Sequence, residues 1–181
     1  MSELIHHAGN YKKLLSYQKA DVIYQMTCYF CAHFLTRGDR TVDQMVHAAR
    51  SGKQNIVEGC AASVTSAKTE IKLVNVGKAS LKELLEDYED YLKVHGHPHR
   101  VEGSAEYEAM RRIGREHSDA AYFMGPVQTR PPETIANMAI ILLNRADYLL
   151  YRQLERLSED FAEHGGFSER MAALRRKRRG Y

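Results

Sequence analysis

The sequence predicts an all-α protein, an up-and-down four-helix bundle with an extra short helix and a C-terminal extension. Only 4 of the 181 residues are proline, and three of these lie between positions 126 and 132, so long stretches carry no helix breaker. Four long segments repeat apolar residues at intervals of three and four, the period of a helix with one buried face. Most connections between these segments are short, which is typical of antiparallel helices packed side by side.

The first two long segments predict helices at residues 16–35 and 41–63. The break between them contains Gly38. We interpret Thr41 and Gln44 as a capping box that opens the second helix. The buried stripe of that helix contains small residues, which would let a neighbouring helix approach closely: Val42, Met45, Ala49, Gly52, Ile56 and Cys60.

The third long helix is expected to begin after an N-cap at Ser66 and to end near Val94, before the turn at residues 95–98. Its last turns are acidic, which is unfavourable at the negative end of a helix dipole. We therefore expect cations from elsewhere in the fold to meet these carboxylates: Glu83, Glu86, Asp87, Glu89 and Asp90.

Residues 96–131 form the least regular part, which we interpret as an insertion. Within it, Ser104 is the expected N-cap of a short polar helix at residues 105–117. Residues 122–130 carry glycine, proline and aromatic residues and predict a loop.

The last long helix is expected at residues 131–163, since proline is tolerated in the first turn of a helix. Residues 167–179 predict one further short helix. We expect two parts, a bundle domain at residues 1–164 and a suffix with a basic tail at residues 165–181.

Two of the expected helices are apolar on more than one face. The residues on these faces are Tyr17, Tyr24, Tyr29, Phe30 and Phe34 in the first helix and Ile140, Leu143, Leu150 and Leu154 in the last. A monomeric bundle buries one face of each helix, so the surplus favours association of copies into a homo-oligomer. The alternative is that residues 1–15, 96–131 and 165–179 cover these faces.

Composition and targeting signals indicate a globular protein in the cytoplasm. Hydrophobic residues make up 44% and charged residues 27%, which argues against disorder. No apolar run approaches the roughly 20 residues of a membrane-spanning helix, so we expect no membrane contact. The first fifteen residues do not read as a secretory signal, and three cysteines without one favour reduced thiols.

The net charge of +3 is unevenly distributed. The tail carries six cations against Glu169: Arg170, Arg175, Arg176, Lys177, Arg178 and Arg179. It is either a solvated helix end or an electrostatic arm for a nucleic acid. The stretch from Arg37 to Lys82 is also basic, and four of its lysines are spaced for the outer surface of the third helix: Lys68, Lys72, Lys78 and Lys82.

A polar cluster lies in the middle of the second expected helix. Helical spacing puts Arg50, Gln54 and Glu58 on one line, with Ser51 and Asn55 on the next. Side chains beside an apolar stripe need hydrogen-bond partners. We interpret the cluster as a network between helices or subunits, the alternative being a ligand or RNA contact.

No motif indicates catalysis, a metal or a cofactor. Cys28 and Cys31 form a CxxC inside a helical pattern, where packing is the expected role. The histidines His95, His97 and His99 lie in a polar turn and lack a paired cysteine or carboxylate motif. Nucleophile elbows and phosphate-binding loops are absent. We expect a protein that is not an enzyme.

Three stretches carry a resemblance to a known family. Residues 48–59 read AARSGKQNIVEG, and residues 79–84 read ASLKEL. These resemble the motifs R-x-x-x-S-I-x-x-N-I-A-E-G and G-S-L-x-E-L of the four-helix bundle proteins encoded by intervening sequences of bacterial 23S ribosomal RNA genes, with Ala79 where glycine is usual. Residues 144–170 resemble the longer subgroup, which carries a suffix after the bundle.

The resemblance implies an up-and-down bundle, a cyclic pentamer with a central channel and no established enzymatic activity. A more distant similarity is to the accessory variability protein of diversity-generating retroelements, a basic pentamer that binds nucleic acid and a reverse transcriptase. Our hypothesis is a non-enzymatic homo-oligomer that binds RNA or DNA, or a nucleic-acid-associated protein. The alternative is a structural or protein-interaction module that binds no nucleic acid.

This hypothesis assigns two sets of residues. The expected nucleic-acid contacts are Arg50, Lys53, Lys68, Lys72, Arg175, Arg176, Lys177, Arg178 and Arg179. The expected bundle or interface network is Arg50, Gln54, Asn55, Glu58, Ser80 and Glu83.

Overall fold

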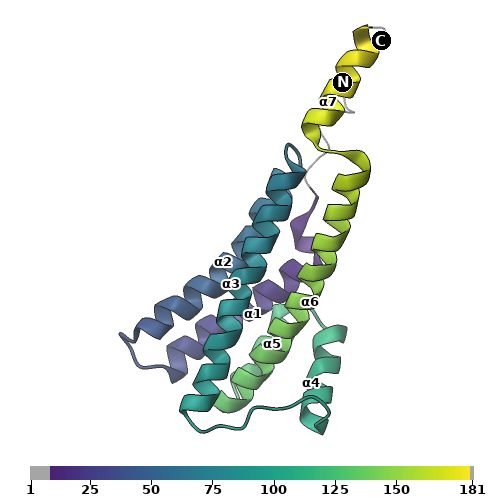
Figure 1. Ribbon diagram of the computed structural model, residues 1–181. Coiled ribbons are helices and arrows are strands. Elements are labelled where there is room, and N and C mark those ends of the chain that lie inside the picture. The colour runs from purple at the N-terminus through teal and green to yellow at the C-terminus, as the bar shows by residue number, and fades with distance from the viewer. Residues whose placement is uncertain (1–8, 180–181) are drawn as a thin grey trace.

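The computed structural model describes residues 9–179, and every regular element in that range is a helix (Figure 1). The predicted all-α class is therefore confirmed. No helix in this range is long and apolar enough to cross a membrane. The elements in chain order are η1 (Tyr11–Lys13), α1 (Leu15–Phe34), α2 (Arg40–Ala62), α3 (Ala67–Val94), α4 (Ala105–Glu116), α5 (Ala120–Val127), α6 (Pro132–His164) and α7 (Phe167–Arg179).

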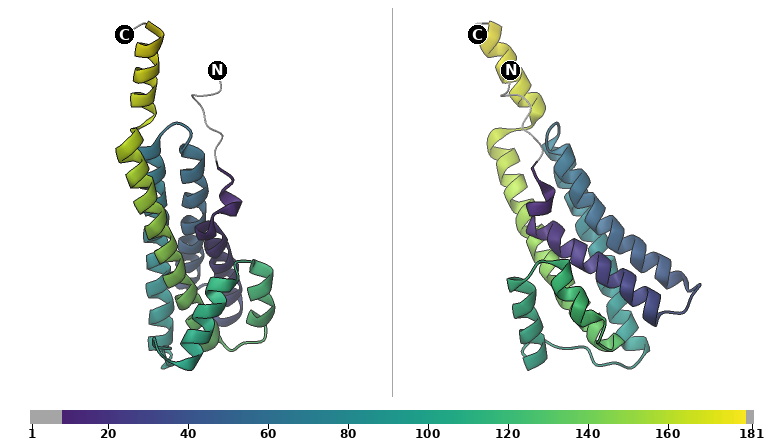
Figure 2. Two further views of the ribbon diagram at one scale, coloured as in Figure 1. Left: turned by 90° about the vertical axis from the view of Figure 1, so that its right-hand side faces the viewer. Right: turned by 180° about the vertical axis from the view of Figure 1, so that it is seen from behind.

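The four long helices α1, α2, α3 and α6 enclose the core. Each packs on two of the others: α2 lies between α1 and α3, and α6 contacts α3 and α1 (Figures 1 and 2). Their predicted apolar stripes meet in one cluster. Tyr88 is fully buried there, and its hydroxyl donates to Thr27 Oγ1 at 3.0 Å, so the core contains a satisfied polar pair.

The closest helix pair, α2 and α3, meets at two glycines. A Cβ on Gly52 would lie 2.6 Å from Leu81 Cγ, and one on Gly77 would lie 3.0 Å from the carbonyl oxygen of Gly52. A side chain at either position would push Leu81 or the facing backbone away, so glycine permits the close approach of the two helices. The close approach predicted from the small residues of the second helix is thus present.

The helix starts follow their capping residues. Ser66 and Ser104 are N-caps as predicted, each accepting a hydrogen bond from the backbone N–H three positions later. At α2 the prediction was wrong: Asp39 is the N-cap, and its carboxylate accepts from Thr41 N at 2.9 Å. The helix therefore begins at Arg40, and Thr41 is already inside it.

The predicted loop at residues 122–130 was also wrong, because most of it belongs to α5. Asp119 caps this helix. Phe123 and Val127, one turn apart, are buried, and the helix packs on α1. Pro126 is accommodated near its C-terminal end. The predicted insertion between α3 and α6 therefore holds two helices.

The segments outside the four long helices cover much of the surplus apolar surface. η1 and α5 pack on α1, while α4 packs on α6. Ile140, Leu143 and Leu150 are buried within one chain. The covering that the sequence left as an alternative is present only in part, through η1, α4 and α5, and association of copies stays a prediction.

Helix α7 extends away from the rest of the molecule (Figures 1 and 2). It follows α6 after Gly165, whose φ of 67° is in the region that glycine adopts readily. Among the described residues, none of the main contacts between elements involves α7. Its side chains therefore face solvent on most sides.

Candidate functional site

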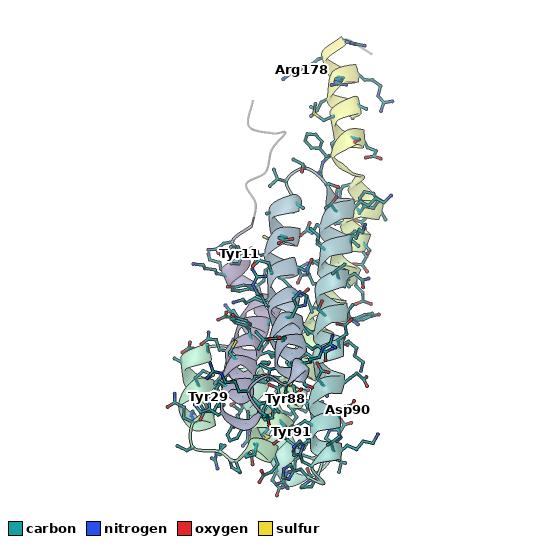
Figure 3. The ribbon with its side chains drawn as sticks, turned by 90° about the vertical axis from the view of Figure 1, so that its left-hand side faces the viewer. Tyr11, Tyr29, Tyr88, Asp90, Tyr91 and Arg178 are labelled. Atoms are coloured by element: carbon teal, nitrogen blue, oxygen red, sulfur yellow. The ribbon has the colours of Figure 1, made fainter. Side chains whose placement is uncertain are left out.

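The basic helix α7 presents its arginines to solvent. Arg175, Arg176, Arg178 and Arg179 are exposed, and within residues 9–179 none of them forms an ion pair. Figure 3 places Arg178 at the outer end of α7, far from the core. The side chain of Lys177 lies outside the described residues. The predicted tail is therefore a helix with uncompensated positive charge.

The remaining predicted nucleic-acid contacts do not form one patch. Lys68 and Lys72 are exposed on the first turns of α3, at the end of the molecule from which α7 emerges (Figure 1). Arg50 is exposed in the middle of α2. Lys53 instead packs against α1: its Nζ lies 3.1 Å from Asp21 Oδ1 and 4.1 Å from the centre of the Tyr24 ring. That ion pair and cation–π contact hold the charge of Lys53 within the chain.

The structure brings together only part of the predicted polar network. The Oγ atoms of Ser51 and Ser80 lie 2.9 Å apart across the seam between α2 and α3. Asn55 Nδ2 donates to the carbonyl oxygen of Ser51 at 2.9 Å. These three residues satisfy one another inside the chain. Within residues 9–179 no side-chain hydrogen bond reaches the other members: Arg50, Gln54, Glu58 and Glu83.

The acidic end of α3 meets no cation from another element in the described part of the chain, so that expectation was wrong there. Glu86 pairs only with Lys82 of the same helix, at 3.8 Å. Burial raises the pKa of Asp87 above its usual value, and the neighbouring carboxylates Asp90 and Glu83 raise it further. Asp90 is labelled in Figure 3.

The cysteine and histidine motifs take part in packing within the fold. Cys31 is a buried free thiol in the core, as predicted, and burial raises its pKa to about 12. Cys28 is also unpaired. The ring of His95 stacks on that of Tyr91 with centroids 4.2 Å apart. Within residues 9–179 no three His, Cys, Asp or Glu side chains gather as a metal site would require.

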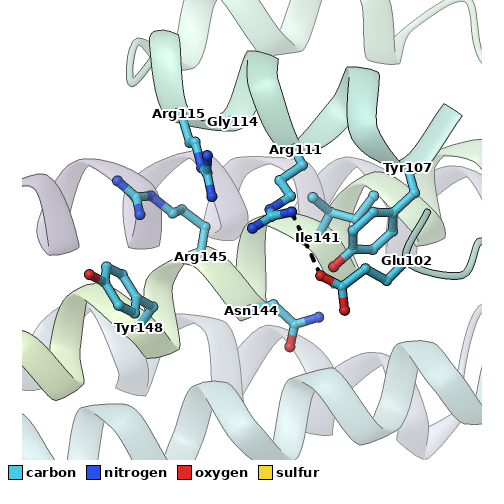
Figure 4. Close-up of a pocket in the computed structure, with 9 residues that line it drawn as sticks. All are labelled: Glu102, Tyr107, Arg111, Gly114, Arg115, Ile141, Asn144, Arg145 and Tyr148. Carbon is cyan, nitrogen blue, oxygen red and sulfur yellow. Dashed lines mark ion pairs between the residues drawn. The ribbon is translucent and has the colours of Figure 1, made fainter. Parts of the chain in front are cut away.

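A groove of about 580 Å³ between α4 and α6 was not predicted from the sequence. Three arginines point into it, Arg111 and Arg115 from α4 and Arg145 from α6 (Figure 4). The two helices are held close by Gly114, where an added Cβ would lie 3.2 Å from Leu142 Cδ2. The remaining lining residues are Glu102, Tyr107, Ile141, Asn144 and Tyr148.

Only one of these arginines has carboxylate partners. The Nη1 atom of Arg111 lies 3.6 Å from Glu102 Oε1 and 3.3 Å from Glu108 Oε2. Arg115 is exposed and forms no ion pair in the described part of the chain. The guanidinium of Arg145 lies 5.3 Å from the centre of the Tyr148 ring. Its Nε is buried and has no hydrogen-bond partner among the described residues.

A buried lysine adds to this positive potential. Lys19 of α1 is 1% exposed, and its ammonium group donates to the carbonyl oxygen of His117. Burial, with a smaller contribution from repulsion by Arg145, lowers the pKa of Lys19 to about 8. No carboxylate among the described residues pairs with it. A second cation therefore lies within electrostatic range of Arg145.

The sequence contained one signal for this groove. Arg111 and Arg115 are four positions apart on a predicted helix, which places them on the same face of that helix. Nothing in the sequence linked them to Arg145, which belongs to a helix that starts well after α4. No family model, curated protein or solved structure matches this chain.

Proposed function

We propose that this chain is a non-enzymatic nucleic-acid-binding protein whose main contact is the basic helix α7. The observation that carries the proposal is a projecting helix with four exposed, unpaired arginines in the described part of the chain. Arginines that replace counterions on phosphates supply most of the affinity of sequence-independent binding. Lys68 and Lys72 would extend this surface on the adjacent end of α3.

We further propose that the four long helices form an up-and-down bundle of the intervening-sequence type, and that copies assemble in the cytoplasm. The neighbour relations of α1, α2, α3 and α6 support the bundle. The resemblance at residues 48–59 and 79–84 supports it too, because these stretches form the glycine-packed, hydrogen-bonded seam of α2 and α3. Assembly would repeat α7 around the particle and multiply its charge.

The test is a fluorescence-anisotropy titration of a labelled 20-nucleotide RNA and of DNA of the same length, between about 50 and 300 mM salt. The unmodified chain is compared with Arg175→Gln/Arg176→Gln. The matched control is Arg112→Gln/Arg130→Gln, which removes two exposed arginines of the body.

We expect the α7 variant to bind at least about tenfold more weakly and to show a shallower dependence on salt, since two phosphate contacts are lost. The control should stay within about twofold of the unmodified chain. Binding at background level in low salt, or an equal loss in both variants, would refute α7 as the nucleic-acid contact.

A second candidate, docking onto a protein partner, is favoured by the apolar stripe of α7. Phe167, Met171 and Leu174 recur at the spacing of one helix face and are all partly exposed. An amphipathic helix of this kind fits an apolar groove on another protein. Retention of a partner after nuclease treatment, and its loss in Met171→Ser/Leu174→Ser, would favour this candidate over nucleic-acid binding.

A further inference from the structure

We propose that the groove between α4 and α6 binds a phosphate-bearing small molecule of about nucleotide size. The groove is built from two helices that pack on each other, so its arginines are positioned by the fold rather than by a loop. It lies on the body of the molecule, away from α7 (Figures 1 and 4). The proposal therefore does not depend on nucleic-acid binding by that helix.

The charge of the groove selects an anion. Arg111, Arg115 and Arg145 all line this groove (Figure 4). The buried ammonium group of Lys19 is close enough to Arg145 for the two charges to repel each other. Among the described residues, Glu102 is the one acidic side chain that lines the groove. Arg111 pairs with Glu102 and Glu108, but Arg115 and Arg145 form no ion pair among the described residues. Their positive charge would be neutralised by an incoming anion.

The types of donor favour phosphate among anions. A guanidinium presents paired N–H groups that match two oxygens of one phosphate, and the group remains charged at any ordinary pH. The terminal N–H groups of Arg145 form no ion pair and no side-chain hydrogen bond among the described residues, so they are free to bind a phosphate in the groove. Asn144 and Tyr107 add neutral hydrogen-bonding groups at the wall.

The size and shape of the groove favour a small molecule. Its volume of about 580 Å³ lies within the usual range for ligand pockets. The exposed aromatic ring of Tyr148 stands at the end where Arg145 lies (Figure 4), and it offers a surface on which a planar base can stack. The groove thus combines a phosphate subsite with an aromatic wall.

The experiment is isothermal titration calorimetry of the full chain with three probes: inorganic pyrophosphate, ADP and adenosine. Pyrophosphate tests the arginines alone, adenosine tests the aromatic wall alone, and ADP tests both. The variants are Arg145→Gln and Arg115→Gln. The control is Arg112→Gln, an exposed arginine on the same helix that does not line the groove. Circular dichroism verifies that each variant is folded.

We expect ADP to bind and adenosine to give no heat. Arg145→Gln and Arg115→Gln should each weaken ADP binding about tenfold or more, and Arg112→Gln should change it less than twofold. Pyrophosphate binding as tightly as ADP would identify inorganic phosphates as the ligand class, while tighter ADP binding would identify nucleotides. Both results support the proposal.

Three results would overturn it: no heat with pyrophosphate or ADP, adenosine binding as tightly as ADP, or an equal effect of Arg112→Gln and Arg145→Gln. The exposed position of Arg115 keeps the test valid if Arg145→Gln fails to fold. Arg175→Gln/Arg176→Gln should bind ADP like the unmodified chain. A fourth pair of results would also refute a small ligand: the unmodified chain does not bind ADP, and Arg145→Gln loses affinity for RNA. The groove would then be a contact for nucleic acid.

Discussion

Glu70 lies in the first turn of α3, and its partial burial makes the ionised form of its carboxyl group unfavourable. Burial raises its pKa from 4.5 to about 7; Arg156 of α6 opposes this shift and Asp160 adds to it. The unfolded chain releases this proton near pH 4.5, whereas the folded chain keeps it until about pH 7. Stability contributed by Glu70 is therefore lost as the pH rises through this window and is lowest above pH 7.

From this follows the prediction for Glu70→Gln, which removes the ionisation. At pH 8 the variant should be more stable than the unmodified chain by about 1 to 2 kcal/mol, because a partly buried charge is no longer formed. At pH 4.5 the two proteins should be equally stable. Urea unfolding at both values measures the difference. The control is Glu58→Gln, at an exposed carboxylate of α2. If Glu70→Gln were also more stable than the unmodified chain at pH 4.5, ionisation of Glu70 would not be the cause of the difference in stability.

Individual residues also show where sequence reasoning stops. The burial of Phe30 and Leu84 followed from helical spacing. Lys19 did not, because a lysine beside an apolar stripe normally extends its ammonium group to water. It is buried here because α5 and the carbonyl oxygen of His117 close over it. That cover comes from residues about one hundred positions away, so no local pattern reports it.

At the scale of elements, the seam between α2 and α3 depends on the absence of a side chain at Gly77. A Cβ there would lie 3.0 Å from the Gly52 carbonyl oxygen and 3.3 Å from Asn55 Cβ. We predict that Gly77→Ala destabilises the fold by about 1 to 2 kcal/mol, since separating the helices costs more than the gain in helix propensity. Urea unfolding followed by circular dichroism measures the change.

The same substitution at an open helical position is the matched control. In the part of the chain that the structure describes, no neighbouring atom lies within 4 Å of a Cβ built on Gly125 of α5, so Gly125→Ala should be neutral or slightly stabilising. Equal shifts in the two variants would show that helix propensity, and not the contact between α2 and α3, determines the response at Gly77.

The helices with strong apolar periodicity could be predicted from the sequence, and α5 could not, for a physical reason. The long helices bury one face along many turns, which leaves a repeated pattern in the sequence. α5 has only eight residues and contains Pro126, so its composition is that of a loop. Its helical signals were an N-cap at Asp119 and apolar residues at positions 123 and 127, which are too few to outweigh the proline.

At the scale of the whole molecule, the candidate sites differ in how far the sequence could predict them. The basic helix α7 is contiguous in sequence, so its composition and charge were visible from the start. The arginine groove needs α4 to lie on α6, an arrangement set by tertiary packing at Gly114 and Leu142. Only the pair on α4, Arg111 and Arg115, could be placed on a common face in advance.

The last prediction concerns assembly. Light scattering after size-exclusion chromatography should give a mass of about five times 20.7 kDa, the pentamer that the family resemblance implies. Tyr151 of α6 is a large aromatic residue that stays 51% exposed in the single chain, and such residues are enriched in interfaces. Tyr151→Ser should therefore shift the mass toward the monomer.

The control for this variant is Val94→Ser, at the last residue of α3, where the apolar side chain is 79% exposed. This control should remain oligomeric. The comparison separates an interface on the outer face of α6 from a general effect of removing apolar surface. A monomeric mass for the unmodified chain at about 100 µM would contradict assembly, because copies that associate through such a face remain together at this concentration. In that case the positive charge available to a polyanion would be that of one α7 alone.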